Sequence, residues 1–343
     1  MKIAYIGTES GTSLQRAHAL GRLGHDVYII DPWEWLHNYA MSTRIHFHSG
    51  YIISGLLIDN KLVNEVRRIN PDLVWVNQGE FLGPSVIKRI RELGVLIVNY
   101  ANDNPFAPQC RRRFHRYRAA LPYYDLVVVV FEHIVEMVKQ AGARRVIRKY
   151  ISADEVAHLG RPQNINQCPE YNYDVIFIGT WIKGQRGTFI SELIRLGVPV
   201  SIWGDHWQKD REWKTIAPHW RGPGVYDEEE YAAILRSAKI CLGLVNKTSG
   251  NQHTDRSIQI PALGSLLCAE RTKEHLAMYE DGKEAVFWDD AKECAQICGE
   301  LLENDKLRRE ITMQGHLRAI RNNLFNEPVL ASVINEALIE CKN

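Results

Sequence analysis

The stretch TDRSIQIPALGSLLCAERTKEH, residues 254–275, contains a short helical pattern that leads straight into an apolar run. The hydroxyl-rich start at Thr254–Ser257 favours a helix N-terminus, and Gly264 favours its end. Pro261 lies inside the helix and lacks an amide hydrogen, so we expect it to kink the helix. The run Ser265–Ala269 follows at once and is typical of a buried strand. A helix that returns the chain directly to a strand indicates an α/β sheet.

The same alternation of short apolar runs and helical patterns continues on both sides of this stretch. The expected strands are Lys2–Ile6, Asp26–Ile30, Leu73–Val76, Val95–Asn99, Leu126–Val130, Arg145–Tyr150, Asp174–Ile178, Pro199–Trp203, Ile240–Val245, Ser265–Ala269 and Ala285–Trp288. Apolar strands that alternate with helices predict parallel, doubly wound sheets.

The alternation stops once, in the polar stretch GRPQNINQCPEYNY at residues 160–173, which has the composition of a linker. A chain of 343 residues is also long enough for two domains. We therefore predict an α/β fold of two tandem Rossmann-like domains facing a cleft. Residues 1–155 form the first domain, 156–173 the linker and 174–325 the second domain. Residues 326–343 form a terminal helix that crosses back to the first domain.

Composition excludes several classes of protein. The formal net charge of +1 argues against a dedicated nucleic-acid binder. We expect no signal peptide, because the chain opens with a strand-like run, and no apolar run is long enough to cross a membrane. The seven scattered cysteines favour reduced thiols and a cytoplasmic protein. Cys294 and Cys298 are four residues apart on an expected helix, where core thiols are favoured over a metal pair.

Loops that directly follow strands are the places to look for ligands, because parallel sheets bind them beyond the strands' carboxyl ends. The loop Gly7–Ser13 contains Gly7, Gly11 and Thr12, and its amides can cradle an anion. The alternative is a tight turn that packs the helix on the sheet. Asp31 ends the next strand, but the glycines lack the spacing of a dinucleotide-binding fingerprint.

Three loops of the second half carry further candidates. Gly179 ends a strand, and Lys183 and Arg186 follow where they can neutralise a diphosphate, unless they are merely solvated. Trp203, in WGDHW, can stack on a base or a sugar or can pack in the core.

The helix start at residues 254–257 offers unpaired amides and the positive end of the helix dipole. Thr254 and Ser257 add hydroxyl groups there, and Arg256 adds a charge. We predict that these three residues form a cradle for a diphosphate.

Longer motifs point to a family. RSIQIPALGSLLCAERTKEHLAMYEDGKEAVFWDD, residues 256–290, resembles the C-terminal signature of glycosyltransferases of GT-B fold. It is most similar to the spore-maturation-protein (CgeB-like) branch of the group 1 enzymes. FIGTWIKGQR, WGDHW and NYANDNP are similar to other marks of that branch. The resemblance covers the second domain well and the first domain loosely.

The resemblance implies transfer of a sugar from a UDP-, GDP- or dTDP-sugar to an acceptor hydroxyl, with no cofactor and no metal. It places Gln259 and Asn251 where the wider family has two glutamates, one of which binds the donor ribose. His253 is a nearby replacement contact for sugar or phosphate and, with Asp103, a catalytic candidate. Arg186 and Glu270 match the branch. An inactive nucleotide-sugar binder remains an alternative, as does an NAD-linked oxidoreductase.

An inverting enzyme needs a general base on the acceptor side, whereas a retaining enzyme can use the leaving phosphate. Asp103, Glu80 and His115 are the first-domain candidates, and Asp103 can instead be a turn residue before Pro105. The basic run Arg111–Arg118 is either a solvated helix face or a contact for an anionic acceptor or a membrane surface.

Overall fold

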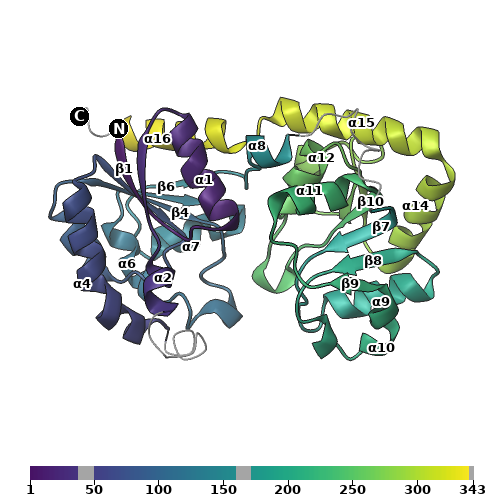
Figure 1. Ribbon diagram of the computed structural model, residues 1–343, viewed down its shortest axis with the longest axis horizontal. Coiled ribbons are helices and arrows are strands. Elements are labelled where there is room, and N and C mark those ends of the chain that lie inside the picture. The colour runs from purple at the N-terminus through teal and green to yellow at the C-terminus, as the bar shows by residue number, and fades with distance from the viewer. Residues whose placement is uncertain (38–49, 160–170, 340–343) are drawn as a thin grey trace. The chain divides into compact units, whose positions relative to one another are not determined.

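The computed structural model describes residues 1–37, 50–159 and 171–339, and these form two compact units (Figure 1). Unit 1 consists of residues 1–150, the short segment 248–250 and the chain from residue 325 onward. Unit 2 consists of residues 151–247 and 251–324. Part of the predicted linker, residues 160–170, lies outside the described residues.

Unit 1 is built around a parallel sheet of six strands in the order β2-β1-β3-β4-β5-β6. The strands are β1 (Lys2–Ile6), β2 (Asp26–Ile30), β3 (Leu73–Asn77), β4 (Leu96–Ala101), β5 (Leu126–Val129) and β6 (Val146–Arg148). The helices are α1 (Gly11–Arg22), α2 (Pro32–His37), α4 (Ile52–Ile69), α5 (Pro84–Arg91), α6 (His115–Ala120), α7 (Val135–Gln140) and α16 (Asn326–Leu338). The central strands β3 and β5 are apolar and buried along almost their whole length, as expected of strands covered on both faces.

Unit 2 has a second parallel sheet of six strands, in the order β12-β11-β10-β7-β8-β9. Its strands are β7 (Tyr173–Ile178), β8 (Val200–Trp203), β9 (Trp220–Gly222), β10 (Ala238–Gly243), β11 (Leu267–Glu270) and β12 (Val286–Trp288). Its helices are α8 (Glu155–His158), α9 (Arg186–Arg195), α10 (Trp213–Ile216), α11 (Glu228–Arg236), α12 (Asp255–Ala262), α13 (Lys273–Met278), α14 (Ala291–Glu303) and α15 (Asp305–Asn322). The predicted fold class, two Rossmann-like α/β domains in tandem, is confirmed.

Two of the differences from the sequence prediction have local reasons. Helix α1 starts at Gly11, three residues before the expected start, so Gly11 and Thr12 belong to its first turn and not to a loop. Strand β9 was not predicted, because a three-residue strand containing Arg221 and Gly222 shows no apolar pattern. Pro261 lies inside α12 as expected, one residue before that helix ends.

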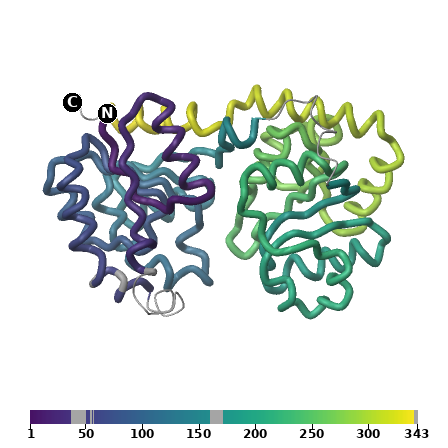
Figure 2. Tube along the Cα trace, viewed as in Figure 1, coloured from purple at the N-terminus to yellow at the C-terminus, as the bar shows by residue number. Residues whose placement is uncertain are grey.

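The terminal helices divide between the units. Helix α15 packs against α12 in unit 2, whereas α16 packs against α1 in unit 1 (Figure 2). Arg22, in the last turn of α1, forms an ion pair with Glu327 of α16 at 2.5 Å. Unit 1 is therefore completed by the far end of the chain.

Apolar side chains of one sheet face form a core cluster of unit 2. Val175, Phe177, Ile240 and Leu242 are fully or almost fully buried and face helices α9 and α14. Each such side chain stabilises the folded state by about 1.5–3 kcal/mol. Within the described ranges, no helix has both the length and the hydropathy that a membrane crossing requires.

Two glycines of unit 2 offer a matched test of this packing. A Cβ at Gly315 in α15 would lie 2.2 Å from the backbone oxygen of Glu284, whereas a Cβ at Gly299 in α14 would meet no atom within 4 Å. We expect Gly315→Ala to lower the free energy of unfolding by about 1–3 kcal/mol through overpacking. We expect Gly299→Ala to raise it by about 0.5–1 kcal/mol, because alanine favours the helix. Urea unfolding followed by tryptophan fluorescence measures both, and equal shifts would contradict the packing.

Candidate functional site

The carboxyl ends of β7, β10, β11 and β12 meet at one edge of the unit 2 sheet, next to a cavity of about 370 Å³. The cavity is lined by the start of α9 and by the residues that follow β10, β11 and β12. The lining residues include Gln185, Arg186, Thr188, Val245, Lys247, Glu270, Trp288 and Asp290. This edge is where parallel sheets bind ligands, and the predicted residue Arg186 lies in it.

Two arginines share one aromatic ring beside this cavity. The guanidinium groups of Arg186 and Arg256 lie 5.3 Å and 5.9 Å from the ring centroid of Phe177. Arg186 is only 8% exposed and donates to the backbone oxygens of Thr180 and Leu244. Within the described ranges neither arginine forms an ion pair, and the Nε of each is buried without an acceptor. The structure thus holds two positive charges together without a carboxylate to neutralise them.

The burial and the closeness of the two arginines lower the pKa of Arg186. Burial, followed by the charge of Arg256, lowers that pKa to about 9, against a weaker opposing effect of Glu270. Arg186 stays charged at neutral pH, so the repulsion between the two guanidinium groups persists until an anion binds. A bound dianion would remove the repulsion and satisfy the unused N–H donors.

Glu270, at the end of β11, cannot neutralise the arginine pair because its carboxylate is already engaged. One oxygen accepts the backbone N–H of Val245 at 3.2 Å, and the other forms an ion pair with Lys247 at 2.7 Å. Of the other two acids of the lining, Asp290 accepts two backbone N–H groups as the N-cap of α14, and Glu192 lies in α9. Glu270 and Asp290 are therefore held by groups other than the arginine pair.

A chain of hydrogen bonds fixes the start of α12. The Nδ1–H of His275 donates to the backbone oxygen of Glu270 at 2.6 Å, so Nε2 accepts the hydroxyl proton of Ser257 at 2.7 Å. Ser257 in turn accepts the backbone N–H of Thr254 at 3.0 Å. The hydroxyl of Ser257 therefore positions the helix start, and one of the donors predicted for a ligand is used within the protein.

His253 lies immediately before this helix and is fully buried. Its Nε2 accepts the backbone N–H of Ile151 at 3.1 Å, and its Nδ1–H donates to the carboxylate of Glu274. Both ring nitrogens are therefore occupied, and neither can accept a proton from a substrate. The structure gives His253 a positioning role in place of the expected role in the chemical step.

The other residues predicted to bind a donor are placed in different ways. Gly179 ends β7, and a Cβ there would meet the ring of Phe177 at 2.7 Å, so only glycine lets this loop approach the arginines. Trp203 packs its ring on Gly222 of β9, which favours the packing alternative. Lys183 is exposed in the loop before α9.

The two positions where the wider family has glutamates lie on either side of the α12 start. Gln259 is buried, and its side-chain oxygen accepts the hydroxyl of Tyr231 in α11 at 2.8 Å. The side-chain oxygen of Asn251 is buried without a partner among the described residues. The amide of Gln259 is thus partly used within the protein.

In unit 1, the expected base candidates Asp103 and Glu80 share one arginine. Arg113 contacts Glu80 at 2.9 Å and Asp103 at 3.2 Å. Burial by itself would lower the pKa of Arg113, but the two carboxylates outweigh it and raise that pKa. Asp103 is 48% exposed and also accepts the side-chain amide of Gln78 at 3.2 Å, so its carboxylate is held in a defined orientation.

The basic run of residues 111–118 is largely engaged within unit 1. Besides Arg113, Arg116 pairs with Asp59 at 2.6 Å. Arg111, His115 and Arg118 line a cavity of about 630 Å³ together with Phe106, Pro108 and Met137. The run is therefore neither a simple solvated face nor a free patch of charge.

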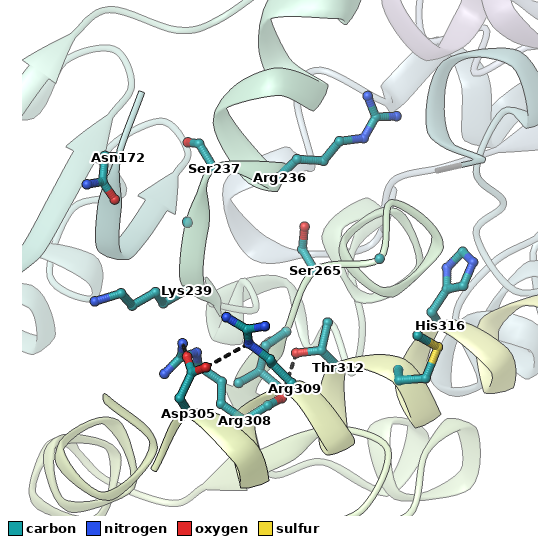
Figure 3. Close-up of a pocket in the computed structure, with 14 residues that line it drawn as sticks. Asn172, Arg236, Ser237, Lys239, Ser265, Asp305, Arg308, Arg309, Thr312 and His316 are labelled. Carbon is teal, nitrogen blue, oxygen red and sulfur yellow. Dashed lines mark hydrogen bonds and ion pairs between the residues drawn. The ribbon is translucent and has the colours of Figure 1, made fainter. Parts of the chain in front are cut away.

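A second cavity of unit 2, about 420 Å³, lies at the opposite edge of the sheet, by the amino ends of β7, β10 and β11 (Figure 3). Its basic residues Arg308 and Arg309 both pair with Asp305, and Lys239 pairs with Asp174. Its charges are thus mostly neutralised within the protein.

The thiol pair expected in α14 has a third member. The sulfur atoms of Cys268 in β11, Cys294 and Cys298 all lie within 4.8 Å of one another, and all three residues are buried. They lie in the apolar core of unit 2, in agreement with the expectation of core thiols.

Sequence reasoning missed the partners of the arginine pair. Phe177 was read only as part of a strand, and Lys247 only as part of a polar loop. A signal existed for Lys247, which follows a strand directly as Lys183 and Arg186 do. No pattern in the sequence indicates that Arg186 and Arg256, 70 positions apart, stand over the same ring.

Comparison with known proteins gives two kinds of match. Residues 186–327 match the family described as glycosyl transferase-like. No curated protein sequence matches the chain.

Several solved structures share the fold across nearly the whole chain. Sucrose-phosphate synthase from Thermosynechococcus elongatus has a TM-score of 0.73 and 12% identity, with 99% of each chain covered. HepE from Anabaena in complex with UDP and glucose has a TM-score of 0.69 and 14% identity, covering 98% of this chain and 100% of that one. Trehalose 6-phosphate synthase from Burkholderia multivorans has a TM-score of 0.62 and 11% identity, covering 99% and 97%.

The hydrogen-bond chain at α12 predicts a pH dependence of stability. Burial lowers the pKa of His275 to about 4, below the value of about 6.5 in an unfolded chain. The unfolded state therefore takes up the proton first, and the free energy of unfolding falls as the pH drops below about 6.5. At about 1.4 kcal/mol per pH unit, we expect a loss of about 2 kcal/mol by about pH 5.

Urea unfolding of the wild type and of His275→Gln at about pH 7 and about pH 5 measures this contribution. We expect a clearly smaller pH dependence in the variant, because its side chain does not titrate. The same dependence in both proteins would mean that other groups cause the loss.

Proposed function

We propose that this chain is a glycosyltransferase of GT-B fold and that its donor is a nucleotide-diphosphate sugar bound to unit 2. The match of residues 186–327 to the glycosyl transferase-like family and the shared fold support this proposal. The related fold of HepE binds UDP and glucose, which supports a UDP-sugar among the candidates UDP-, GDP- and dTDP-sugar. The acceptor is assigned to unit 1.

The observation that carries this proposal is the unpaired arginine couple. A diphosphate brings negative charge that Arg186 and Arg256 can share, each with an N–H donor that has no acceptor among the described residues. Charge-assisted hydrogen bonds of this kind are about twice as strong as neutral ones. The first-turn amides of α12, next to Thr254, add the positive end of the helix dipole.

In the reaction, the bond between the anomeric carbon and the diphosphate oxygen breaks, and a bond from that carbon to the acceptor hydroxyl oxygen forms. The electron pair of the broken bond stays on the diphosphate, whose charge grows as the transition state develops. The arginine pair stabilises this developing charge because it is in place before the reaction begins.

The acceptor hydroxyl must lose its proton, and we assign that proton to Asp103 in an inverting reaction. Its exposure and its fixed orientation between Arg113 and Gln78 support the assignment. In a retaining reaction, the leaving diphosphate takes the proton instead. His253 positions the start of α12, as its buried hydrogen bonds require.

The other contacts to the sugar donor are assigned from where residues lie around the start of α12 and in the loop after β7. Asn251 and Gln259 flank the start of α12 and present amides to the ribose or the sugar. Gly179 gives the loop after β7 close access and Lys183 is exposed in that loop, whereas Trp203 supports the site through its packing on Gly222. Within unit 1, the cavity beside Arg111 and Arg118 fits an anionic or membrane-bound acceptor. The free cysteines of the described chain, all of them buried except Cys110, fit a cytoplasmic protein.

Removing one arginine charge tests the donor site. We expect Arg256→Gln and Arg186→Gln each to weaken the binding of the nucleoside diphosphate about 10- to 100-fold, as loss of a charged hydrogen bond implies. Arg195→Gln is the control, because Arg195 lies in the same helix as Arg186 but pairs with Glu212 at the surface. Calorimetric titration with UDP, GDP and dTDP gives the affinities.

Unchanged affinity in both arginine variants would overturn the assignment of the diphosphate. Release of nucleoside diphosphate from the sugar donor in the presence of acceptor separates a working enzyme from a protein that only binds.

Metal dependence is tested on the wild type. Because the arginine pair supplies the positive charge that the leaving diphosphate needs, we expect turnover to be unchanged after treatment with EDTA. Turnover is measured as diphosphate release, with and without added Mg²⁺ or Mn²⁺. Loss of activity on chelation, restored by either ion, would contradict a metal-free site.

A further inference from the structure

Unit 1 contains a buried arginine that lacks a counter-charge. Arg16, in α1, is 1% exposed and forms no ion pair with any described residue. Its Nη1 donates to the side-chain oxygen of Asn77 at 3.3 Å, and its guanidinium lies 4.9 Å from the ring centroid of Tyr100. Its Nε is buried without an acceptor. Arginine is almost never fully buried unless it is paired, and it does not give up its proton.

The position of Arg16 indicates what would neutralise it. Side chains in a helix lean toward the N-terminus, so Arg16 extends toward the start of α1. Asn77, its partner, is the last residue of β3. Gly7, just after β1, lies against both elements, since a Cβ there would be 2.7 Å from Ser13 and 3.1 Å from Asn77. Arg16 therefore lies at the carboxyl edge of the sheet, where ligands bind.

The start of α1 is open to an anion. Its first turn contains no acidic residue, and Ser10 makes no capping hydrogen bond with its side chain. Gly11 has a φ of +51°, and no atom lies within 4 Å of the place where its Cβ would be. The nearby carboxylate of Asp31 already accepts the backbone N–H groups of Glu9 and Trp33. The amides of this turn thus meet neither a cap nor a competing carboxylate.

Asn77 connects the buried charge to the surface. Its side-chain oxygen is turned to Arg16, which leaves the amino group as a donor with no acceptor among the described residues. The side chain of Asn77 is partly exposed. Arg16 therefore orients two N–H donors beside the first turn of α1 and adds a full positive charge behind them.

We propose that the first turn of α1, Asn77 and Arg16 form a binding site in unit 1 for the oxyanion group, phosphate or carboxylate, of the acceptor substrate. The identity of the ligand as the acceptor rests on the proposed function, whereas the anion site rests on the buried charge alone. Arg16 is a positioning residue in this site, because it acts through Asn77 and through its charge.

The test uses the full-length protein and inorganic phosphate as the probe, with ionic strength held constant by sodium chloride. We expect phosphate to raise the thermal unfolding midpoint of the wild type. Arg16→Gln should weaken that apparent affinity about tenfold or more, as expected for loss of a charged partner. Arg22→Gln, in the same helix but paired with Glu327, should respond as the wild type does.

A second variant keeps the proposal testable if Arg16→Gln does not fold. Asn77→Asp places a carboxylate 3.3 Å from the Arg16 guanidinium and so supplies the missing counter-charge. We expect it to raise the unfolding midpoint without phosphate and, when combined with Arg256→Gln to weaken the anion site of unit 2, to abolish the phosphate response. A wild type insensitive to phosphate, or an Asn77→Asp protein that is less stable and whose combined variant still responds, would overturn the site.

Titration with UDP shows whether the anion site of unit 1 binds the acceptor or the nucleotide donor. It also tests that site separately from the donor site proposed for unit 2. If the site serves the acceptor, Arg16→Gln binds UDP as the wild type does, and Arg256→Gln keeps its response to phosphate. Loss of UDP binding in Arg16→Gln would assign the site to the donor and overturn the acceptor assignment. A wild type that responds to phosphate but not to any nucleoside diphosphate would overturn the proposed function and leave the anion site standing.

Discussion

The parallel direction of every strand is the constraint on which the rest of this structure depends. Each sheet has six strands that all run the same way, so all the loops that follow strands meet at one edge of the unit. Helix starts face the same edge, and their dipoles give it a positive potential. The chain thus builds two edges suited to anions from α/β units alone, before any particular side chain is considered.

Both units strengthen this potential in the same physical way, by keeping arginine charges without carboxylates. In unit 2 the pair Arg186 and Arg256 shares the ring of Phe177, and in unit 1 Arg16 is buried against Asn77. An unpaired buried charge is unfavourable for folding, by several kcal/mol in typical cases. A protein can keep such an unpaired charge where a bound anion neutralises it. The free energy that the charge costs on folding is then regained when the anion binds.

Neutral hydrogen-bond chains hold these charges in place. His275 and Ser257 connect the end of β11 to the start of α12, and His253 connects Glu274 to the backbone at residue 151. Because the histidines are buried and their nitrogens are all used, they set geometry and are not available for proton transfer. The exposed and oriented carboxylate of Asp103 is better suited to that role.

The sequence by itself determined the fold class and most of the strands, and it indicated Arg186 and Arg256 as candidates, because period, caps and strand-following loops are local properties. It could not decide which side chains are buried with a partner. His253 reads as an available base until Ile151 and Glu274 occupy its nitrogens. Arg16 reads as one more helix residue until the fold removes it from water without a carboxylate. Burial and pairing join residues far apart in the chain, so only the tertiary structure decides them.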